Sequence, residues 1–273
     1  MDYLKNILTI KKNEIKELYK SYGMDNAMLH IEKQKDKRDF ISNIKKNKVN
    51  IIAEIKKASP SRGVFNDNLN VGEVASLYDR HKSFICGISV ITEPVYFKGS
   101  KEFIKKVREF SNIPILRKDF IFHENQIYES LELGASCILL ISSILGLKKL
   151  KSLYEKAKEI GLEALVEVHS RQEFDRALDC GAGLIGINNR NLKNMRVNLN
   201  TTFEILAYAK NTTKNIKDKI IVCESGVDDI GFIKKMYLEG ISTFLIGSYF
   251  MKSISLEKTL NDFETGLRNE NLI

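Results

Sequence analysis

The segment IIAEIKKASPSRG, from Ile51 to Gly63, places two opposite charges at the end of a short apolar run. Side chains on a β-strand alternate between its two faces, so Glu54 and Lys56 point the same way. Opposite charges at the end of a buried strand are costly unless they pair closely or serve a site. A charged pair on one strand is also common on a solvated face, so other segments of the chain have to decide between the two.

Four more apolar runs end in polar or charged residues. They contribute Lys118 and Phe120 from ILRKDF, Glu167 from LVEVH, Asn188 and Arg190 from GINNRNL, and Glu224, Ser225 and Gly226 from CESG. A lysine in an apolar pocket has its ammonium form destabilised by desolvation, so we expect Lys118 to become a usable acid near neutral pH. Each residue alone has a simpler explanation, such as a stabilising ion pair. Their repetition at five strand ends favours a catalytic site.

The apolar runs themselves predict the framework that brings these residues together. They cover Asn50–Ile55, Ile85–Thr92, Ile113–Asp119, Ser136–Ile141, Glu163–Val168, Leu184–Asn188, Ile220–Ser225 and Thr243–Gly247. Most are continuously apolar, which is typical of parallel strands covered on both faces. Eight such strands, separated by seven helices and followed by a final helix at Leu256–Arg268, predict a (β/α)8 TIM barrel. In that fold the carboxyl ends of the strands meet at the face that holds the active site.

Signals at the helix ends support the same alternation. Glycine is favoured just past a helix end because it adopts the left-handed conformation at no steric cost. Four glycines stand between a helical stretch and the next strand: Gly134, Gly161, Gly181 and Gly240. Ser170 followed by Glu173 predicts a capping box at the start of the fifth helix of the barrel.

The last two predicted strands end in small residues that suit a phosphate group. The segments ESGV and LIGS place Gly226, Gly247 and Ser248 where barrel enzymes often bind phosphate through backbone N–H groups and a short helix. Small residues are needed there because the anion has to touch the backbone. Gly-Ser pairs are also frequent in ordinary turns, so only their place in the strand order makes them informative. Ser59, in the loop after the first strand, could add a hydroxyl.

About 48 residues precede the first predicted strand, with helical patterns at Tyr3–Tyr19 and Arg38–Lys46. A barrel does not need them. They could cap the bottom of the barrel, pack beside the active face or mediate oligomerisation. No Pro/Gly-rich linker separates them from the barrel, so we expect a single domain over residues 1–273, with a helical extension at 1–48 and the barrel at 49–268.

The net charge of +8 comes from lysines dispersed over many predicted helices. A nucleic-acid-binding protein would need a concentrated basic patch with stacking aromatics, so we expect an anionic small molecule as the partner. No apolar run reaches the roughly 18 residues that span a membrane, and the N-terminus lacks the apolar centre of a secretory signal. The cysteines occur singly, at Cys86, Cys137, Cys180 and Cys223, which is typical of reduced thiols in the cytoplasm.

Segments along nearly the whole chain resemble those of indole-3-glycerol phosphate synthase, an enzyme of tryptophan biosynthesis. In order they are IIAEIKKASPSRG, SVITEPVYFKGS, ILRKDFIFHENQIYES, GASCILLI, LVEVH, IGINNRNL, VCESGV and FLIGSYFM. The resemblance implies a carboxy-lyase that acts on 1-(2-carboxyphenylamino)-1-deoxyribulose 5-phosphate. Such an enzyme closes a pyrrole ring with loss of carbon dioxide and water, and the resemblance implies neither a metal ion nor an organic cofactor.

The resemblance also implies a role for each candidate residue. We expect Lys118 to be the acid of ring closure and Lys56 to meet the carboxylate of the substrate. Glu167, with Lys56 or Glu54, would serve the dehydration. The other expected contacts are the phosphate with Ser59, Gly226, Gly247 and Ser248, the aromatic ring with Phe97 and Phe120, and the sugar hydroxyls with Asn188 and Glu224.

Two alternatives remain open from the sequence. Another phosphate-binding barrel, such as phosphoribosylanthranilate isomerase, would need a Cys/Asp acid–base pair at the strand ends, and none stands there. A non-catalytic, basic nucleic-acid-binding protein would need a basic stripe away from the mouth of the barrel. For the enzyme we expect a monomer or a weak homo-oligomer.

Overall fold

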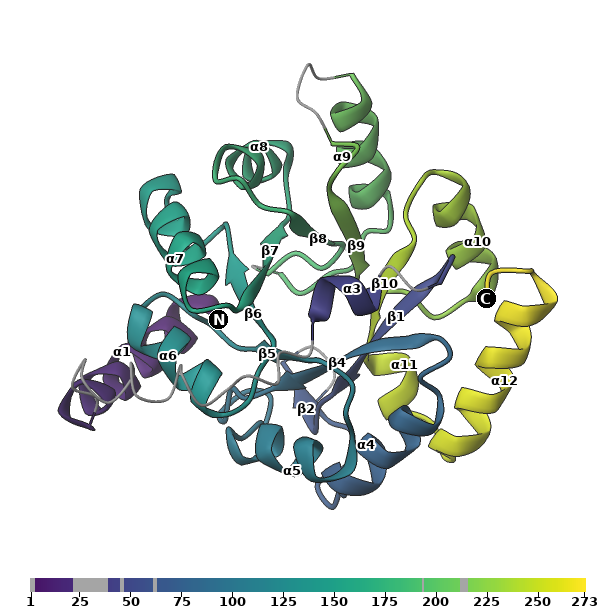
Figure 1. Ribbon diagram of the computed structural model, residues 1–273, viewed down its shortest axis with the longest axis horizontal. Coiled ribbons are helices and arrows are strands. Elements are labelled where there is room, and N and C mark those ends of the chain that lie inside the picture. Colours follow the sequence, from purple (N-terminus) through teal and green to yellow (C-terminus); the bar gives the residue numbers. More distant parts are fainter. Residues whose placement is uncertain (1–2, 22–38, 45–46, 61–62, 193, 212–215) are drawn as a thin grey trace.

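The computed structural model describes residues 3–21, 39–44, 47–60, 63–192, 194–211 and 216–273. Its centre is a closed barrel of parallel strands (Figure 1), in the order β1, β10, β9, β8, β7, β6, β5 and β4. The barrel strands are β1 (Asn50–Ile55), β4 (Ile85–Ile91), β5 (Ile115–Lys118), β6 (Cys137–Ile141), β7 (Glu163–Val168), β8 (Leu184–Asn188), β9 (Ile220–Glu224) and β10 (Thr243–Ile246). The short strands β2 (Ala58–Ser59) and β3 (Gly63–Val64) pair with each other after β1.

Helices alternate with the barrel strands and surround them (Figure 1). They are α4 (Val71–Arg80), α5 (Glu102–Phe110), α6 (Glu124–Glu132), α7 (Leu147–Glu159), α8 (Arg171–Asp179), α9 (Asn200–Lys210), α10 (Ile230–Leu238), α11 (Ser248–Met251) and α12 (Leu256–Asn269). Two helices, α1 (Tyr3–Ser21) and α3 (Phe40–Ile44), precede the barrel. No helix in the described part of the chain is long and apolar enough to cross a membrane.

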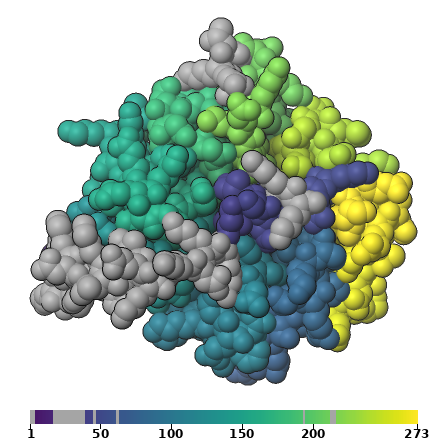
Figure 2. All heavy atoms as spheres, in the orientation of Figure 1, coloured from purple at the N-terminus to yellow at the C-terminus, as the bar shows by residue number. Residues whose placement is uncertain are grey.

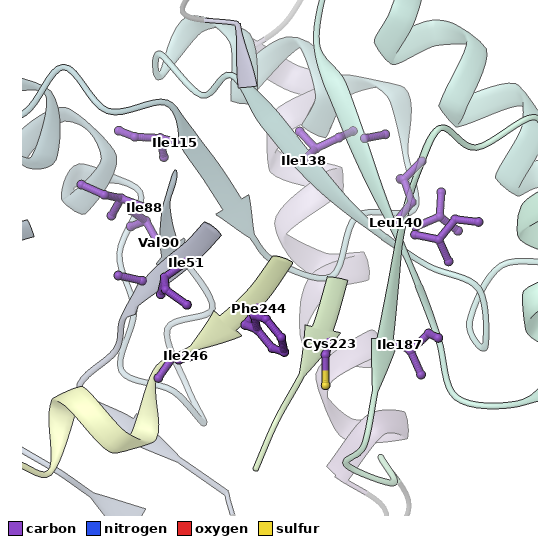
Figure 3. Close-up of a cluster of buried hydrophobic side chains, with 14 of the residues drawn as sticks. Ile51, Ile88, Val90, Ile115, Ile138, Leu140, Ile187, Cys223, Phe244 and Ile246 are labelled. Atoms are coloured by element: carbon purple, nitrogen blue, oxygen red, sulfur yellow. The ribbon is translucent and has the colours of Figure 1, made fainter. Parts of the chain in front are cut away.

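Apolar side chains fill one layer between the strands and the helices and a second layer inside the barrel. In β6, Ile138 and Leu140 belong to the outer layer shown in Figure 3, while Leu139 belongs to the inner one. Because both faces of each strand are buried, nearly every position along it is apolar. This burial is the reason why the strands stand out in the sequence as continuous apolar runs.

The predicted eight-strand barrel is confirmed, with strand bounds that differ from the prediction by at most two residues. β5 begins at Ile115 and not at Ile113, because Pro114 has no N–H to contribute to the ladder. The predicted glycines after helices all have positive φ: Gly134 (92°), Gly161 (79°), Gly181 (84°) and Gly240 (99°).

The predicted capping box at α8 is half correct. The Ser170 hydroxyl accepts a hydrogen bond from the Glu173 N–H, at 3.3 Å, as expected. The Glu173 carboxylate accepts the backbone N–H of His169, at 2.8 Å, and not that of Ser170. Glu173 therefore ties the end of β7 to the start of α8.

The helix α3 covers the amino end of the barrel and lies over its centre in Figures 1 and 2. Its Phe40 is fully buried and lies so close to Gly87 that a Cβ on that glycine would be 3.1 Å from the ring. The Asn43 side chain donates a hydrogen bond to the Cys86 carbonyl, also near the start of β4. Of the three expected roles of the extension, capping the bottom of the barrel is therefore confirmed for α3. Arg38, Lys45 and Lys46 lie outside the described residues.

The helix α1 packs beside α6 (Figure 1) and contacts the opposite, carboxyl end of the barrel through Lys11. Its Lys11 is buried, with Nζ 2.8 Å from Oδ1 of Asp119, the residue that follows β5. Asp119 also accepts hydrogen bonds from Thr92 (2.6 Å) and Arg117 (3.2 Å). Lys11 and Arg117 hold the pKa of Asp119 below its usual value, although burial alone would raise it. Part of the extension is thus anchored beside the active face.

Replacing Lys11 by Met should lower the free energy of unfolding by about 2–4 kcal/mol, because a buried carboxylate loses one of its cations. Arg117 still contacts Asp119, which keeps the loss below that of a fully unpaired charge. Urea denaturation measures the change. Lys12→Met, on the exposed face of the same helix, should stay within about 0.5 kcal/mol of the wild type. Equal losses for the two variants would contradict the anchoring role.

Candidate active site

A cavity of about 650 Å³ opens at the carboxyl ends of the barrel strands. The structure places every candidate residue from the sequence along its wall: Glu54, Lys56, Ser59, Phe97, Lys118, Phe120, Glu167, Asn188, Arg190, Glu224, Ser225, Gly226, Gly247 and Ser248. These residues lie in, or in the segments that follow, seven of the eight barrel strands, all except β6. The barrel therefore brings together groups that are up to 194 positions apart in the chain, from Glu54 to Ser248.

Lys118, at the end of β5, lies among carboxylates. Its Nζ is 3.1 Å from Glu167 Oε2 and 3.4 Å from Glu224 Oε2. Burial alone lowers the pKa of Lys118, but the charges of Glu167, Glu224 and Glu54 outweigh burial and raise the pKa above its usual value. The expectation that desolvation lowers the pKa of Lys118 toward neutral pH is therefore wrong. It treated the mouth of the barrel as apolar, whereas neighbouring strands supply compensating charge.

The three carboxyl groups around Lys118 do not share one ionisation state. Burial, with Glu167 and Glu54 nearby, raises the pKa of Glu224 to about 8 in spite of Lys118. The pKa of Glu167 is lowered, because Lys118 and His169 outweigh its burial. The pKa of Glu54 is also lowered, because Lys56 and Lys118 outweigh its burial. Near neutral pH the site therefore holds two carboxylates and one protonated carboxyl group, that of Glu224.

Lys56 and Glu54 form the ion pair that the strand alternation predicts. Lys56 Nζ lies 2.5 Å from Glu54 Oε1, and both side chains are largely buried. Gly247, at the end of β10, passes directly beside the pair. A Cβ on Gly247 would overlap Glu54 Oε1 and would lie 3.0 Å from Lys56 Nζ. The absence of a side chain at position 247 therefore makes room for the pair.

The ends of β9 and β10 form a corner lined by small residues. Ser225 and Gly226 have φ of 66° and 78°, a left-handed conformation that is costly for serine. The Asn189 side chain donates a hydrogen bond to the Ser225 carbonyl, at 3.1 Å, and so helps to hold this turn. In the same cavity, the buried Ser59 hydroxyl makes no hydrogen bond to any described residue. A strained turn and a buried unpaired hydroxyl together suit an anion that accepts hydrogen bonds.

Phe97 and Phe120 supply aromatic surface to the cavity. The loop that carries Phe97 is held by Glu93, which is buried and was missed in the sequence. Its carboxylate accepts the backbone N–H groups of Val95 (3.0 Å), Tyr96 (2.7 Å) and Phe97 (2.9 Å). The signal for Glu93 was its place two residues after the end of β4, close to a strand end like Glu167 of β7 and Glu224 of β9.

Arg190 lines the cavity, but its guanidinium group serves its own loop. Nη1 donates a hydrogen bond to the Met195 carbonyl, at 2.9 Å. The Asn188 side chain accepts the Arg190 N–H, also at 2.9 Å. Both residues thus shape the loop after β8 as well as the wall of the cavity.

A histidine that sequence reasoning missed lies outside the cavity wall and next to Glu167. His169 directly follows β7, in the segment LVEVH, and its Nε2 lies 3.3 Å from Glu167 Oε1. Its Nδ1 lies 3.2 Å from Glu173 Oε2. Burial alone lowers the pKa of His169, but Glu167 and Glu173 together raise it to about 10. The sequence signal for His169 was that a titratable side chain stands two positions after Glu167 and four positions before Glu173.

Among the described residues, no group of three or more His, Cys, Asp and Glu side chains has the arrangement of a metal site.

The model of the indole-3-glycerol phosphate synthase family matches residues 4–263. The chain belongs to the indole-3-glycerol phosphate synthase family. A relative from Aliarcobacter butzleri (strain RM4018) is 40% identical over 261 residues, which cover 96% of this chain and 94% of the relative. One from Campylobacter jejuni (strain RM1221) is 41% identical over 225 residues, which cover 82% and 84%. Both relatives are named indole-3-glycerol phosphate synthase.

Membership in the indole-3-glycerol phosphate synthase family makes this chain a carboxy-lyase of tryptophan biosynthesis. It also decides against the isomerase alternative. None of the four cysteines lines the cavity, and all four are buried elsewhere as free thiols.

Solved barrels of other families share the fold at low sequence identity. 3-Hexulose-6-phosphate synthase from Salmonella typhimurium has a TM-score of 0.62 at 15% identity, over 81% of this chain and 99% of that one. KGPDC from Streptococcus mutans has a TM-score of 0.58 at 11% identity, over 81% and 98%. At such identities the likeness shows the fold alone.

Gly247→Ala should lower kcat/KM by about 10- to 100-fold while the protein stays folded, because the added methyl group displaces the Glu54–Lys56 pair. Steady-state kinetics, with thermal unfolding in parallel, test this expectation. Gly183→Ala is the matched control, since the nearest atom to its added Cβ would be the Tyr154 hydroxyl at 3.9 Å. An unchanged kcat/KM in Gly247→Ala would show that the close approach has no catalytic consequence.

Proposed function

We propose that the cavity binds 1-(2-carboxyphenylamino)-1-deoxyribulose 5-phosphate and that five ionisable side chains and one amide convert it to indole-3-glycerol phosphate. The observation that supports this proposal is Lys118 held between Glu167 and Glu224 at the centre of the cavity. The other proposed members are Glu54, Lys56 and Asn188. Neither a metal ion nor an organic cofactor takes part.

The phosphate group is assigned to the corner formed by the ends of β9 and β10 and by the loop after β1. Ser59, Gly226, Gly247 and Ser248 line this corner, next to Ser225. The unpaired Ser59 hydroxyl supports the assignment, as does the left-handed turn at Ser225 and Gly226. Barrel enzymes commonly bind phosphate at these two strand ends.

The aromatic half of the substrate is assigned to the part of the cavity that Phe97 and Phe120 line. Its ring lies between Phe97 and Phe120. Its carboxylate takes the place of the Glu54 carboxylate as the partner of the Lys56 ammonium group. Because Lys56 is already paired in the free enzyme, the substrate carboxylate replaces one ionic contact by another and the lysine is never left unpaired.

In ring closure, the ring carbon that bears the carboxylate attacks the ketone carbon and a carbon–carbon bond forms. The carbonyl oxygen becomes a hydroxyl group, and Lys118 donates the proton. Its surrounding carboxylates keep the donor fully protonated, and its charge stabilises the negative charge that develops on the oxygen. The bond to carbon dioxide then breaks, and its electron pair restores the aromatic ring.

In dehydration, the new hydroxyl group leaves as water after receiving a proton, and a neighbouring C–H proton is removed. Glu167, with Lys56 or Glu54, supplies the base and the acid. Asn188 and Glu224 orient the sugar hydroxyls. The protonated carboxyl group of Glu224 can donate a hydrogen bond, which an ionised one could not.

We expect the enzyme to act in the cytoplasm as a monomer or a weak homo-oligomer. Four free, buried cysteines support a reducing compartment. The dispersed lysines support attraction of an anionic small molecule over binding of nucleic acid.

Inorganic phosphate or sulfate should bind at the ends of β9 and β10 and compete with the substrate. Gly247→Asp, which adds a negative charge beside the proposed phosphate, should weaken phosphate inhibition and raise KM by at least about tenfold. Inhibition kinetics measure both quantities, and Gly146→Asp, away from the cavity, is the control. Normal substrate affinity in Gly247→Asp would contradict the assigned phosphate site.

The two lysines should give different defects. Lys118→Met should lower kcat by about 10²- to 10⁴-fold with a smaller change in KM, because it removes the acid of ring closure. Lys56→Met should raise KM, because it removes a charge that binds the ground state, and it should also slow dehydration. Indole formation, followed by absorbance or fluorescence, gives the rates.

Single-turnover trapping separates the proposed steps further. A cyclised, decarboxylated but still hydroxylated intermediate should accumulate with Lys56→Met and never with Lys118→Met. Reversed results for the two variants would leave the reaction intact and would refute the assigned lysine roles.

A further inference from the structure

His169 occupies a place between the active site and the start of α8. On one side, its Nε2 lies 3.3 Å from Glu167 Oε1, while Glu167 Oε2 lies 3.1 Å from Lys118 Nζ. On the other side, its Nδ1 lies 3.2 Å from Glu173 Oε2. Four charged groups therefore follow one another from α8 to the centre of the cavity: Glu173, His169, Glu167 and Lys118.

Glu173 is itself held in place by the backbone. Its carboxylate accepts the His169 N–H at 2.8 Å, and its own N–H is capped by the Ser170 hydroxyl. Arg176 Nη2 lies 4.0 Å from its other oxygen, Oε1. A rigid helix start thus fixes the carboxylate that orients the imidazole ring.

Neither His169 nor Glu173 lines the active-site cavity. His169 borders a separate cavity of about 400 Å³, which Thr201 and Glu204 of α9 also line. The histidine therefore acts on the reaction only through Glu167.

We propose that His169, oriented by Glu173, is a positioning residue that fixes one oxygen of Glu167 and keeps this carboxylate ionised during the reaction. The inference rests on the proposed role of Glu167 in dehydration. It assigns a function to a pair of residues outside the cavity wall.

The charges around Glu167 explain why a second cation is needed. Glu167 is 1% exposed, and it faces Lys118 from β5 but also Glu224 from β9 and Glu54 from β1. Lys118 is shared among all three carboxyl groups. Without the imidazolium group, burial and the charge of Glu54 would raise the pKa of Glu167, and a protonated carboxyl group cannot act as the base.

A purely structural role for His169 has to be separated from this one, because the ring also links β7 to α8. Loss of such a link would lower the melting temperature and would reduce activity equally at all pH values. Loss of the positioning role would change the pH profile, because Glu167 would bind a proton at higher pH.

The test measures kcat and kcat/KM against pH for His169→Leu, His169→Asn and Glu173→Gln. In His169→Leu the acid limb of both profiles should move up by about 1–3 pH units, the usual effect of one close opposite charge. His169→Asn keeps a side-chain donor without the charge, so it should retain most of the activity above the limb but show the same shift. Glu173→Gln should shift the limb less, because the imidazolium group remains.

The matched control is His123→Asn. His123 caps the start of α6, after another barrel strand, and its side chain accepts the Asn125 N–H at 3.2 Å. This variant should leave the acid limb in place. If His169→Leu does not fold, the asparagine variant still reports the shift.

An acid limb that stays at its wild-type position in both His169 variants would overturn the proposal. Glu167→Gln distinguishes this outcome from a failure of the proposed role of Glu167. If Glu167→Gln turns over normally, the role of the glutamate itself is wrong. If Glu167→Gln is inactive and the His169 variants show no shift, only the positioning role is wrong.

Discussion

The active site depends on burying more carboxyl groups than ammonium groups in one cavity. Glu54, Glu167 and Glu224 share Lys56 and Lys118, at distances where each charge strongly changes the ionisation of the others. Desolvation, together with the charges of Glu167 and Glu54, raises the pKa of Glu224 in spite of Lys118, so Glu224 keeps its proton near neutral pH. The same imbalance keeps Lys118 protonated. One electrostatic constraint thus provides a charged donor, an ionised carboxylate and a neutral carboxyl group within a few ångströms.

The barrel has to leave room for this cluster, and two glycines do so. A Cβ on Gly186 of β8 would overlap Glu224 Oε1, and one on Gly247 would overlap Glu54 Oε1. Gly186 lies in β8, which pairs with the strand of Glu224, β9. Gly247 directly follows β10, which pairs with the strand of Glu54, β1. The sheet therefore accommodates the charges by omitting side chains, and the strand register fixes where those omissions have to be.

The sequence predicted the barrel and the cavity wall well because both depend on short-range rules. Continuous apolar runs mark strands buried on both faces, and alternation decides that Glu54 and Lys56 point together. The ionisation of Lys118 was not predictable in this way, because Glu167 and Glu224 reach it from strands 49 and 106 positions later in the chain. His169 was hidden for a different reason. Glu173 matched a local capping pattern at the start of α8. That pattern explained the presence of Glu173 and gave no reason to expect that its carboxylate also contacts His169 at the end of β7.

The end of β5 shows how three successive side chains connect the layers of the molecule. Arg117 points outward and pairs with Glu129 of α6 at 2.8 Å, Lys118 points into the cavity, and Asp119 pairs with Lys11 of α1. Arg117 Nη2 also lies 3.2 Å from Asp119 Oδ2, so the two neighbours of Lys118 are bound to each other as well as to separate helices. A lysine side chain is long and flexible, and its fixed position therefore requires a backbone that cannot move. The buried network on both sides of Lys118 provides that rigidity, which links the packing of α1 and α6 to the placement of the proposed acid.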